Sequence, residues 1–302
     1  FKQKTAYEIG VRLVGSEMCI RDRYRVDGTT FAAVAFTTLG RDHLDFHGSM
    51  EDYEAAKARL FDGTFAGRAV ISTADLAGRR MARRAEIAGM SVVAIDPHSA
   101  DSTVSATGCT VAWRGRTLVV NTGGRFTVAN ALLAAELALV LGCSEEEVVA
   151  GLTDATPVPG RFQPVSLPGG PTVIVDYAHT PDALEAALAA ARDALNMSTG
   201  GPDRSPDRKP GRLVVVFGCG GERDVGKRSL MGQVADESAD LVVVTSDNPR
   251  GEPPEGVIAD ILAGCLLYTS DAADEGLGVD LGARRIIKKK QGGGGGGGGG
   301  GG

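Results

Sequence analysis

The sequence predicts an α/β fold in which helices cover a mostly parallel sheet. Short apolar, β-branched runs alternate along the chain with segments of helical periodicity. This alternation is typical of βαβ units, because two parallel strands need a crossover between them, usually a helix. A length of 302 residues, 43% of them apolar, allows two globular domains of ordinary size.

Six segments carry the strand pattern, with start and stop signals for helices between them. The predicted strands are 34–39, 68–72, 91–96, 172–176, 212–218 and 241–246. The candidate helix starts are the capping boxes Ser49 with Asp52 and Ser144 with Glu147, and the pair Thr180-Pro181. The longest helix is expected over 128–141, and because it is apolar nearly all round we expect it to be buried.

The two ends of the chain do not resemble protein sequence. Residues 292–302 are all glycine, a composition that cannot bury a core. Stretches within 1–23 and 265–302 resemble translations of the oligonucleotide adapters used in short-read DNA libraries. We interpret both segments as artefact, expect them to be disordered, and leave them out of the prediction of the fold.

The remaining residues divide best at a segment rich in proline. TPVPGRF, residues 156–162, has two prolines and a glycine after a predicted helix. We therefore expect one domain over 24–156 and a second over 157–264. The polar stretch 197–211 is expected to be a surface insertion between a helix and a strand.

Charge and cysteine content exclude several classes of protein. Residues 24–264 hold 22 basic and 31 acidic side chains, a net charge of −9, and show no basic stripe with interleaved aromatics, which disfavours a nucleic-acid-binding protein. No apolar run approaches the roughly 20 residues that cross a membrane, and no signal peptide begins the chain. Residues 24–264 contain three cysteines at no metal-like spacing, which fits a reducing compartment, so we expect a cytoplasmic protein. They are Cys109, Cys143 and Cys219.

A glycine-rich turn after the strand at 212–218 nearly matches a phosphate-binding P-loop. Gly221, Gly226 and Lys227 fit the P-loop spacing, but Arg228 occupies the position of the hydroxyl that holds magnesium, so the sequence is not a P-loop. Its basic residues, with Arg223 among them, suit a phosphate or carboxylate ligand. A solvated turn with scattered charge explains the pattern equally well.

Three other motifs follow predicted strands or lie close behind them. FTTLGRDHLDFHG ends in side chains suited to magnesium or substrate, although such a cluster is as often a hydrogen-bonded loop. These side chains are Arg41, Asp42, His43, Asp45 and His47. Lys57 follows in a helix, where spacing alone favours a surface lysine beside Glu54. DYAHTPD offers Asp176, His179 and a helix N-terminus to one ligand, or else a Thr180 cap with a core histidine.

DNPR, residues 247–250, is the last motif. Its proline pre-sets a turn after the strand at 241–246, so Asp247 and Arg250 present opposite charges side by side. Such a pair suits an amino acid, which carries both charges. An internal salt bridge of little energetic value is the alternative.

Together these motifs resemble the Mur ligases, in the branch that adds diaminopimelate. The likeness runs in order over nearly all of 24–264, through TTLGRDHLDFHG, MEDYEAAK, GRFTVANALLA, VPGRF, VDYAHTPDAL, FGCGGERDVGKR and SDNPR. The resemblance implies an incomplete central ATPase-type domain followed by an incomplete Rossmann-like C-terminal domain. It also implies that ATP phosphorylates a substrate carboxylate and that an amine attacks the resulting acyl phosphate.

The resemblance assigns roles to residues around the nucleotide. His43 would bind Mg²⁺, and Lys57 would hold Mg²⁺ as a carbamate formed with carbon dioxide. Asn130, Arg161 and Asp176 match positions that contact ATP, and His179 belongs to the same motif as Asp176 and is expected in the active site. These implied roles are catalytic for His43, Lys57 and His179.

The resemblance also identifies the substrates, UDP-N-acetylmuramoyl dipeptide and meso-diaminopimelate. Arg223, Asp247, Asn248 and Arg250 match the positions that recognise diaminopimelate. Arg250 discriminates, because a guanidinium can pair with the second carboxylate that lysine lacks. Nucleic acid and membrane are not expected partners.

Two positions depart from the family pattern. Thr38 and Thr127 each stand where the family has asparagine, and the loss of an amide can weaken the corresponding contact. The family's P-loop, its uridine-nucleotide domain and its GKGHE motif have no counterpart in the chain, so we expect no ligase activity from the chain as written, and an exposed edge on the central sheet. The alternatives are a lysine-adding or folylpolyglutamate-type ligase, and a non-catalytic ligand-binding fragment.

Overall fold

A computed structural model describes residues 28–41, 47–166, 170–199, 211–222, 224–265 and 284–288. The predicted artefact segment 1–23 lies outside these residues, as does 265–302 apart from Cys265 and 284–288. The chain forms two compact units, Phe1–Asp203 and Arg204–Gly302, and each is described by itself.

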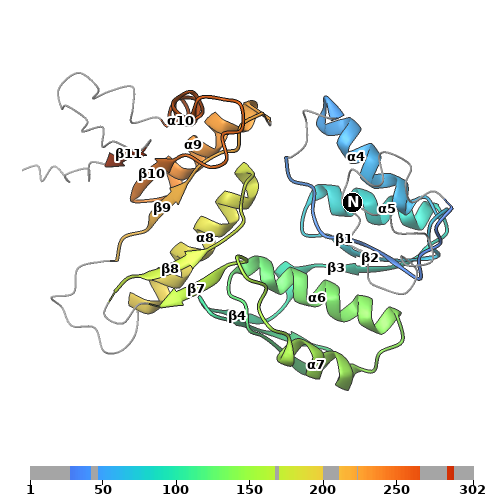
Figure 1. Cartoon of the computed structure of the whole chain (residues 1–302). Helices are drawn as coiled ribbons and strands as arrows, with labels where there is room; N and C mark the ends of the chain where they lie inside the picture. Colours follow the sequence, from blue (N-terminus) through green and yellow to red (C-terminus); the bar gives the residue numbers. More distant parts are fainter. Residues whose placement is uncertain are drawn as a thin grey trace, which may run out of the picture. The chain divides into compact units, whose positions relative to one another are not determined.

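The first sheet of unit 1 is parallel, as predicted. Its strand order is β1-β2-β3, formed by β1 (Val34–Phe36), β2 (Arg68–Ser72) and β3 (Ser91–Ile95). The connections contain α4 (Met50–Ala58), the 3₁₀ turn η1 (Arg59–Phe61) and α5 (Leu76–Ile87). In Figure 1, α5 and the later helix α6 (Arg125–Val140) lie on opposite faces of this sheet.

The central strand β2 shows why both faces are covered. Its residues alternate between two cores: Ile71 packs with Phe36, Phe61 and Met81, while Val70 packs in the other core. Val70 and Ile71 are fully buried. A strand buried on both faces is expected to read as a continuous apolar run, which is how this segment was recognised in the sequence.

A meander follows β3 that the sequence analysis missed. It consists of β4 (Ser102–Val104), β5 (Cys109–Trp113) and β6 (Arg116–Val120), all antiparallel. Arg114 and Gly115 both have positive φ, at 50° and 75°, which is the backbone of a tight two-residue hairpin. The prediction of a mostly parallel sheet was therefore wrong for this part of the chain.

Two helices cover the core that contains Val70. They are α6 (Arg125–Val140) and α7 (Glu145–Asp154), with a 3₁₀ turn η2 (Pro97–Ser99) before the meander. Seven residues of α6 between Thr127 and Glu136 are buried, but Asn130 and Ala134 are exposed and 137–140 are only partly buried, so the prediction of a buried helix is confirmed in part. Ser144 and Glu147 form the complete capping box. At Ser49 only half of the box forms, because its hydroxyl accepts from the amide of Asp52 and donates to that residue's carboxylate.

A buried carboxylate ties the meander to α6 and gives a stability prediction. Glu136 accepts hydrogen bonds from Trp113 Nε1 at 2.8 Å and from two nitrogens of Arg114 at 2.9 Å each. Burial raises the pKa of Glu136, but the hydrogen bonds from Arg114 and Trp113 outweigh it and leave the pKa lowered. Replacing Glu136 by alanine leaves these donors without an acceptor, so we expect the free energy of unfolding to fall by about 2 kcal/mol.

Urea denaturation measures this loss. Glu146→Ala is the matched control, because Glu146 also pairs with an arginine but is exposed. Equal losses for the two variants would contradict the structural role of Glu136.

Unit 1 ends with a two-stranded ribbon and the long helix α8. β7 (Gln163–Ser166) and β8 (Thr172–Val175) are antiparallel, and α8 spans Pro181–Thr199. With 19 residues, α8 is longer than the 16-residue α6, so the prediction of the longest helix was wrong. The amide of Ala183 donates to Thr180 Oγ1 at 3.3 Å, which confirms the predicted cap.

Unit 2 contains a three-stranded sheet and two helices. The order is β11-β10-β9, with β9 (Val214–Phe217) parallel to β10 (Leu241–Thr245) and β11 (Arg284–Lys288) antiparallel to it. Helices α9 (Gly226–Ser238) and α10 (Pro254–Leu262) pack side by side (Figure 1). β11 lies within the segment 265–302 that the sequence analysis interprets as artefact.

The two units confirm the predicted α/β class. Among the described residues, no helix combines the length and apolarity needed to cross a bilayer.

Candidate active site

Lys57 reaches the carboxyl end of β1. Its Nζ donates a hydrogen bond to the carbonyl oxygen of Thr38 at 3.0 Å and lies 4.7 Å from the centroid of the Tyr53 ring. Glu54, the carboxylate expected beside a surface lysine, instead accepts two hydrogen bonds from Arg80, each at 2.6 Å. Lys57 is therefore directed toward the segment that follows β1.

That segment contacts two other elements. Thr38 Oγ1 donates to the carboxylate of Asp75, the N-cap residue of α5, at 3.1 Å. The amide of Arg41 donates to the carboxylate of Asp182 at 2.8 Å, which connects the segment to the start of α8. His43 lies outside the described residues, together with Asp42 and Asp45.

Asp176 organises a second cluster in unit 1. Its two carboxylate oxygens accept hydrogen bonds from the amides of Phe162 at 2.8 Å and Ala178 at 2.7 Å. The VPGRF and DYAHT motifs, predicted as separate signals, are joined by these bonds. Each carboxylate oxygen retains a lone pair, so Asp176 can still accept a bond from a hydroxyl group of a ligand.

Arg161 and His179 lie beside Asp176 in the same cluster. The guanidinium of Arg161 lies 4.8 Å from the ring centroid of Tyr177, and the ring of His179 meets that tyrosine edge-on at 5.1 Å. His179 Nδ1 is 3.0 Å from the Tyr177 carbonyl oxygen, a bond that fixes the orientation of the ring. His179 is exposed, so the alternative of a core histidine is wrong. Sequence reasoning missed the part played by Tyr177.

Helix α6 extends this cluster. Phe126 packs edge-on against Phe162, with ring centroids 5.5 Å apart. Asn130 is exposed one turn further along the same face of α6, where its amide is open to a ligand. The hydroxyl of Thr127 donates to the Gly123 carbonyl at 2.7 Å and is buried, so it is already used by the helix itself.

In unit 2, the turns after β9 and β10 lie against each other. The amide of Gly221 donates to the carbonyl of Asn248 at 3.1 Å. A Cβ at Gly221 would lie 1.9 Å from the carbonyl oxygen of Pro249, so only glycine permits this approach. Asp247, Asn248 and Arg250 are exposed, and the turn holds Asn248 and Arg250 at φ of 30° and 53°. Arg223 lies outside the described residues.

Arg228 does not offer its charge to an anionic ligand. It is 1% exposed, and its guanidinium pairs with Glu252 at 2.7 Å and Asp260 at 2.8 Å. Lys227 is also buried. Two of the three cations that suggested a phosphate or carboxylate site in this turn are thus inside the fold, and that part of the interpretation was wrong.

The pair gives a prediction for the pH dependence of stability. Hydrogen bonds from Arg228, and then from the amide of Glu222, lower the pKa of Glu252 from 4.5 to about 2. A depressed carboxyl pKa stabilises the folded state above the ordinary pKa and loses this effect as the pH falls. The stability difference between wild type and Glu252→Gln should therefore be constant above pH 4.5 and shrink between 4.5 and 2.

Thermal unfolding across this pH range measures the difference. Glu255→Gln, at an exposed carboxylate in the first turn of α10, is the control and should show no such trend. A Glu252→Gln difference that stays constant down to pH 2 would contradict the lowered pKa of Glu252.

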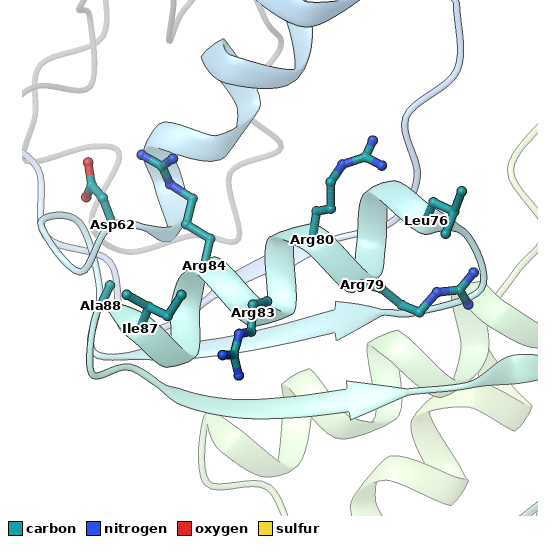
Figure 2. Close-up of a pocket in the computed structure, with 8 residues that line it drawn as sticks. All are labelled: Asp62, Leu76, Arg79, Arg80, Arg83, Arg84, Ile87 and Ala88. Atoms are coloured by element: carbon teal, nitrogen blue, oxygen red, sulfur yellow. The ribbon is translucent and has the colours of Figure 1, made fainter.

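A surface hollow along α5 contains none of the predicted site residues. It is lined by Asp62, Leu76, Arg79, Arg80, Arg83, Arg84, Ile87 and Ala88. Figure 2 shows the four guanidinium groups splayed along the helix rather than converging on one point. A small anion needs convergent donors, so this hollow is not the candidate site. Within the described residues, no three His, Cys, Asp or Glu side chains form a group that could hold a metal ion.

The two clusters in unit 1 and the paired turns in unit 2 occur in domains of one known family. Residues 4–138 match the Mur ligase middle domain, and residues 160–277 match the Mur ligase glutamate ligase domain. The chain belongs to the Mur ligase family, as the motifs indicated.

One relative carries the name of a particular ligase. The UDP-N-acetylmuramoyl-L-alanyl-D-glutamate--2,6-diaminopimelate ligase of Chromobacterium violaceum is 42% identical over 252 residues, which are 80% of this chain and 49% of that protein. A solved structure of a ligase of the same name is 30% identical, with a TM-score of 0.51 over 84% of this chain and 52% of that one.

A more distant neighbour shows the fold alone. Folylpolyglutamate synthase from Mycobacterium tuberculosis, in a complex with ADP, is 20% identical, with a TM-score of 0.57 over 77% of this chain and 51% of that one. The chain thus spans about half the length of the relatives it matches.

The predicted domain bounds stay a prediction. The boundary at 156/157 falls between the two matched ranges, whereas the compact units divide at Asp203/Arg204. The matched ranges also reach into 1–23 and 265–302, so the interpretation of those segments as artefact stays a prediction too.

Proposed function

We propose that the chain is part of an ATP-dependent ligase that adds meso-diaminopimelate to UDP-N-acetylmuramoyl-L-alanyl-D-glutamate. The observation that carries this proposal is the turn after β10, where Asp247 and Arg250 are exposed within four residues of each other. Diaminopimelate has amino and carboxylate groups at both ends, and Arg250 can pair with the second carboxylate. The name of the 42% identical relative supports the same substrate.

ATP fits the cluster around Asp176. Asn130 and Arg161 are exposed, and the carboxylate of Asp176 can accept from a ribose hydroxyl, so these residues would hold the adenosine end. When bound, ATP supplies the phosphoryl group that activates the substrate carboxylate. Arg161, with its guanidinium against Tyr177, is restrained before any ligand arrives, which lowers the entropic cost of binding.

Magnesium fits the end of β1 on one condition. The ammonium of Lys57 repels a cation, but a carbamate on Nζ carries the oxygen ligands that Mg²⁺ prefers. Lys57, whose Nζ bonds the Thr38 carbonyl, would hold that carbamate in the segment that leads to His43. We propose Lys57 and His43 as the metal ligands, and His179 as an active-site residue. The bond from the Arg41 amide to Asp182, three residues after His179, joins this segment to the start of α8.

The alternatives make different demands on Arg250 and Lys57. A lysine-adding ligase has no second carboxylate to bind, and the likeness to folylpolyglutamate synthase shows the fold alone. A non-catalytic binding fragment needs no carbamate on Lys57. The cytoplasm, where ATP is available, is the proposed location.

Sequencing the source locus with adapter-trimmed long reads, followed by an assay of the complete gene product, tests the proposal. We expect a longer reading frame whose product consumes ATP when the UDP-linked dipeptide and meso-diaminopimelate are both present, and releases little phosphate with lysine or glutamate. A reading frame that ends where this chain ends, or a product that prefers lysine or glutamate, would overturn the proposal.

A further inference from the structure

We propose that Arg228 is a positioning residue that aligns the amino-acid-binding turn after β10 with the turn after β9. The inference rests on the proposed function and adds a residue that contacts no substrate. Arg228 is the largest side chain in the described residues with less than 2% exposure. A charged group is buried to this degree only when its partners are fixed.

The carboxylate of Glu252 joins the two turns. Its Oε1 accepts from Arg228 Nη2 at 2.7 Å and also from the amide of Glu222, while its Oε2 accepts from Arg228 Nη1 at 2.9 Å. Glu222 belongs to the turn after β9, and Glu252 follows Arg250 by two residues. One carboxylate thus holds both turns to the same guanidinium.

The backbone of the turns needs this restraint. Glu222, Asn248 and Arg250 all have positive φ, a conformation that costs a non-glycine residue about 1 kcal/mol or more. Such a turn persists only when its surroundings hold it. The Arg228–Glu252 pair lies at the end of this strained stretch and supplies that support, so the direction of the Arg250 side chain depends on a residue on α9.

Asp260 provides an internal control. It accepts a second bond from Arg228 Nη1 at 2.8 Å, but it lies on α10 and is 47% exposed. Asp260 therefore shares the ion pair from helix α10, outside the sequence of either turn. A purely structural role for Arg228 predicts similar effects from loss of Glu252 and loss of Asp260, whereas positioning predicts an effect specific to Glu252.

The first experiment measures hydrogen exchange in the 302-residue chain, which needs no activity. Arg228→Lys and Glu252→Gln should speed exchange of the amides of 220–222, 248 and 250–252 by about tenfold or more. Asp260→Asn and Arg212→Lys, the latter at an exposed arginine before β9, should leave them unchanged. Unchanged exchange in Arg228→Lys and Glu252→Gln overturns the inference, whether or not the proposed function holds.

The second experiment uses the complete ligase. Arg228→Lys and Glu252→Gln should raise the KM for meso-diaminopimelate by about 10- to 100-fold, with the KM for ATP unchanged, because a small displacement of binding groups has effects of that size. Asp260→Asn should leave both KM values unchanged. Equal rises in the KM for meso-diaminopimelate and for ATP, or a rise in either KM with Asp260→Asn, would contradict positioning and leave Arg228 with a purely structural role. A wild-type ligase that does not use diaminopimelate contradicts the proposed function, and the hydrogen-exchange result still tests whether Arg228 positions the two turns.

Discussion

Arg250→Met in the complete ligase is expected to lower kcat/KM for meso-diaminopimelate by about 100-fold or more, since a charged substrate group loses its partner in a site built to bind it. The guanidinium of Arg250 is exposed on the turn after β10, where φ of 53° fixes the backbone beneath it. Arg250→Lys should recover only part of the loss, because an ammonium cannot form the two parallel bonds that a guanidinium gives a carboxylate. Steady-state kinetics with meso-diaminopimelate as the varied substrate measures the loss.

Lysine is the matched competing substrate. It lacks the second carboxylate, so its already low kcat/KM should change little in Arg250→Met, and the preference for diaminopimelate over lysine should collapse. Arg212→Met, at an exposed arginine before β9, controls for the loss of a positive charge from the surface. If Arg250→Met lowers kcat/KM for lysine and for diaminopimelate equally, the guanidinium of Arg250 does not bind the second carboxylate of diaminopimelate.

The sequence predicted the elements with the strongest local signals. Segments 68–72 and 241–246 contain the apolar runs AVI and LVVV, which are typical of strands covered on both faces, and β2 is covered in this way. Ser144 and Glu147 form their capping box because both partners lie within one turn of the helix. The meander at 102–120 was missed because its strands are short and half-exposed, and because the Arg114-Gly115 turn is not the asparagine–glycine pair that usually marks a hairpin.

The candidate site was predictable as motifs but not as contacts. Arg161 and Asp176 were identified separately, yet the bond from Phe162 to Asp176 joins residues 14 apart, and no local pattern encodes it. Arg228 shows the same limit more strongly. Its neighbours in sequence are glycine and basic residues, which suggested an anion site, whereas its partners Glu252 and Asp260 come from 24 and 32 residues away. The sequence does not show whether a single charged residue is buried. The burial of Arg228 changed its interpretation from an anion-binding residue to a structural one.

Lys57→Arg in the complete ligase is expected to lower kcat by about 100- to 1,000-fold, the usual effect of removing one group that stabilises developing charge. Arginine keeps the positive charge near Tyr53 and the donor to the Thr38 carbonyl, but a guanidinium does not form a carbamate. A lysine that served only to hold Thr38 would tolerate this change. Phosphate release measured under saturating substrates gives kcat, and thermal unfolding checks that the fold is kept.

Carbon dioxide separates the carbamate from any other role of Lys57. Wild-type ligase equilibrated in CO₂-depleted buffer should lose activity and regain it on addition of bicarbonate, since the carbamate forms reversibly on the neutral amine. Lys57→Glu places a carboxylate near the same position and should keep a low activity that does not depend on CO₂. Full activity of Lys57→Arg, or a wild type indifferent to bicarbonate, would leave Lys57 as a packing residue that fixes the end of β1 through Thr38.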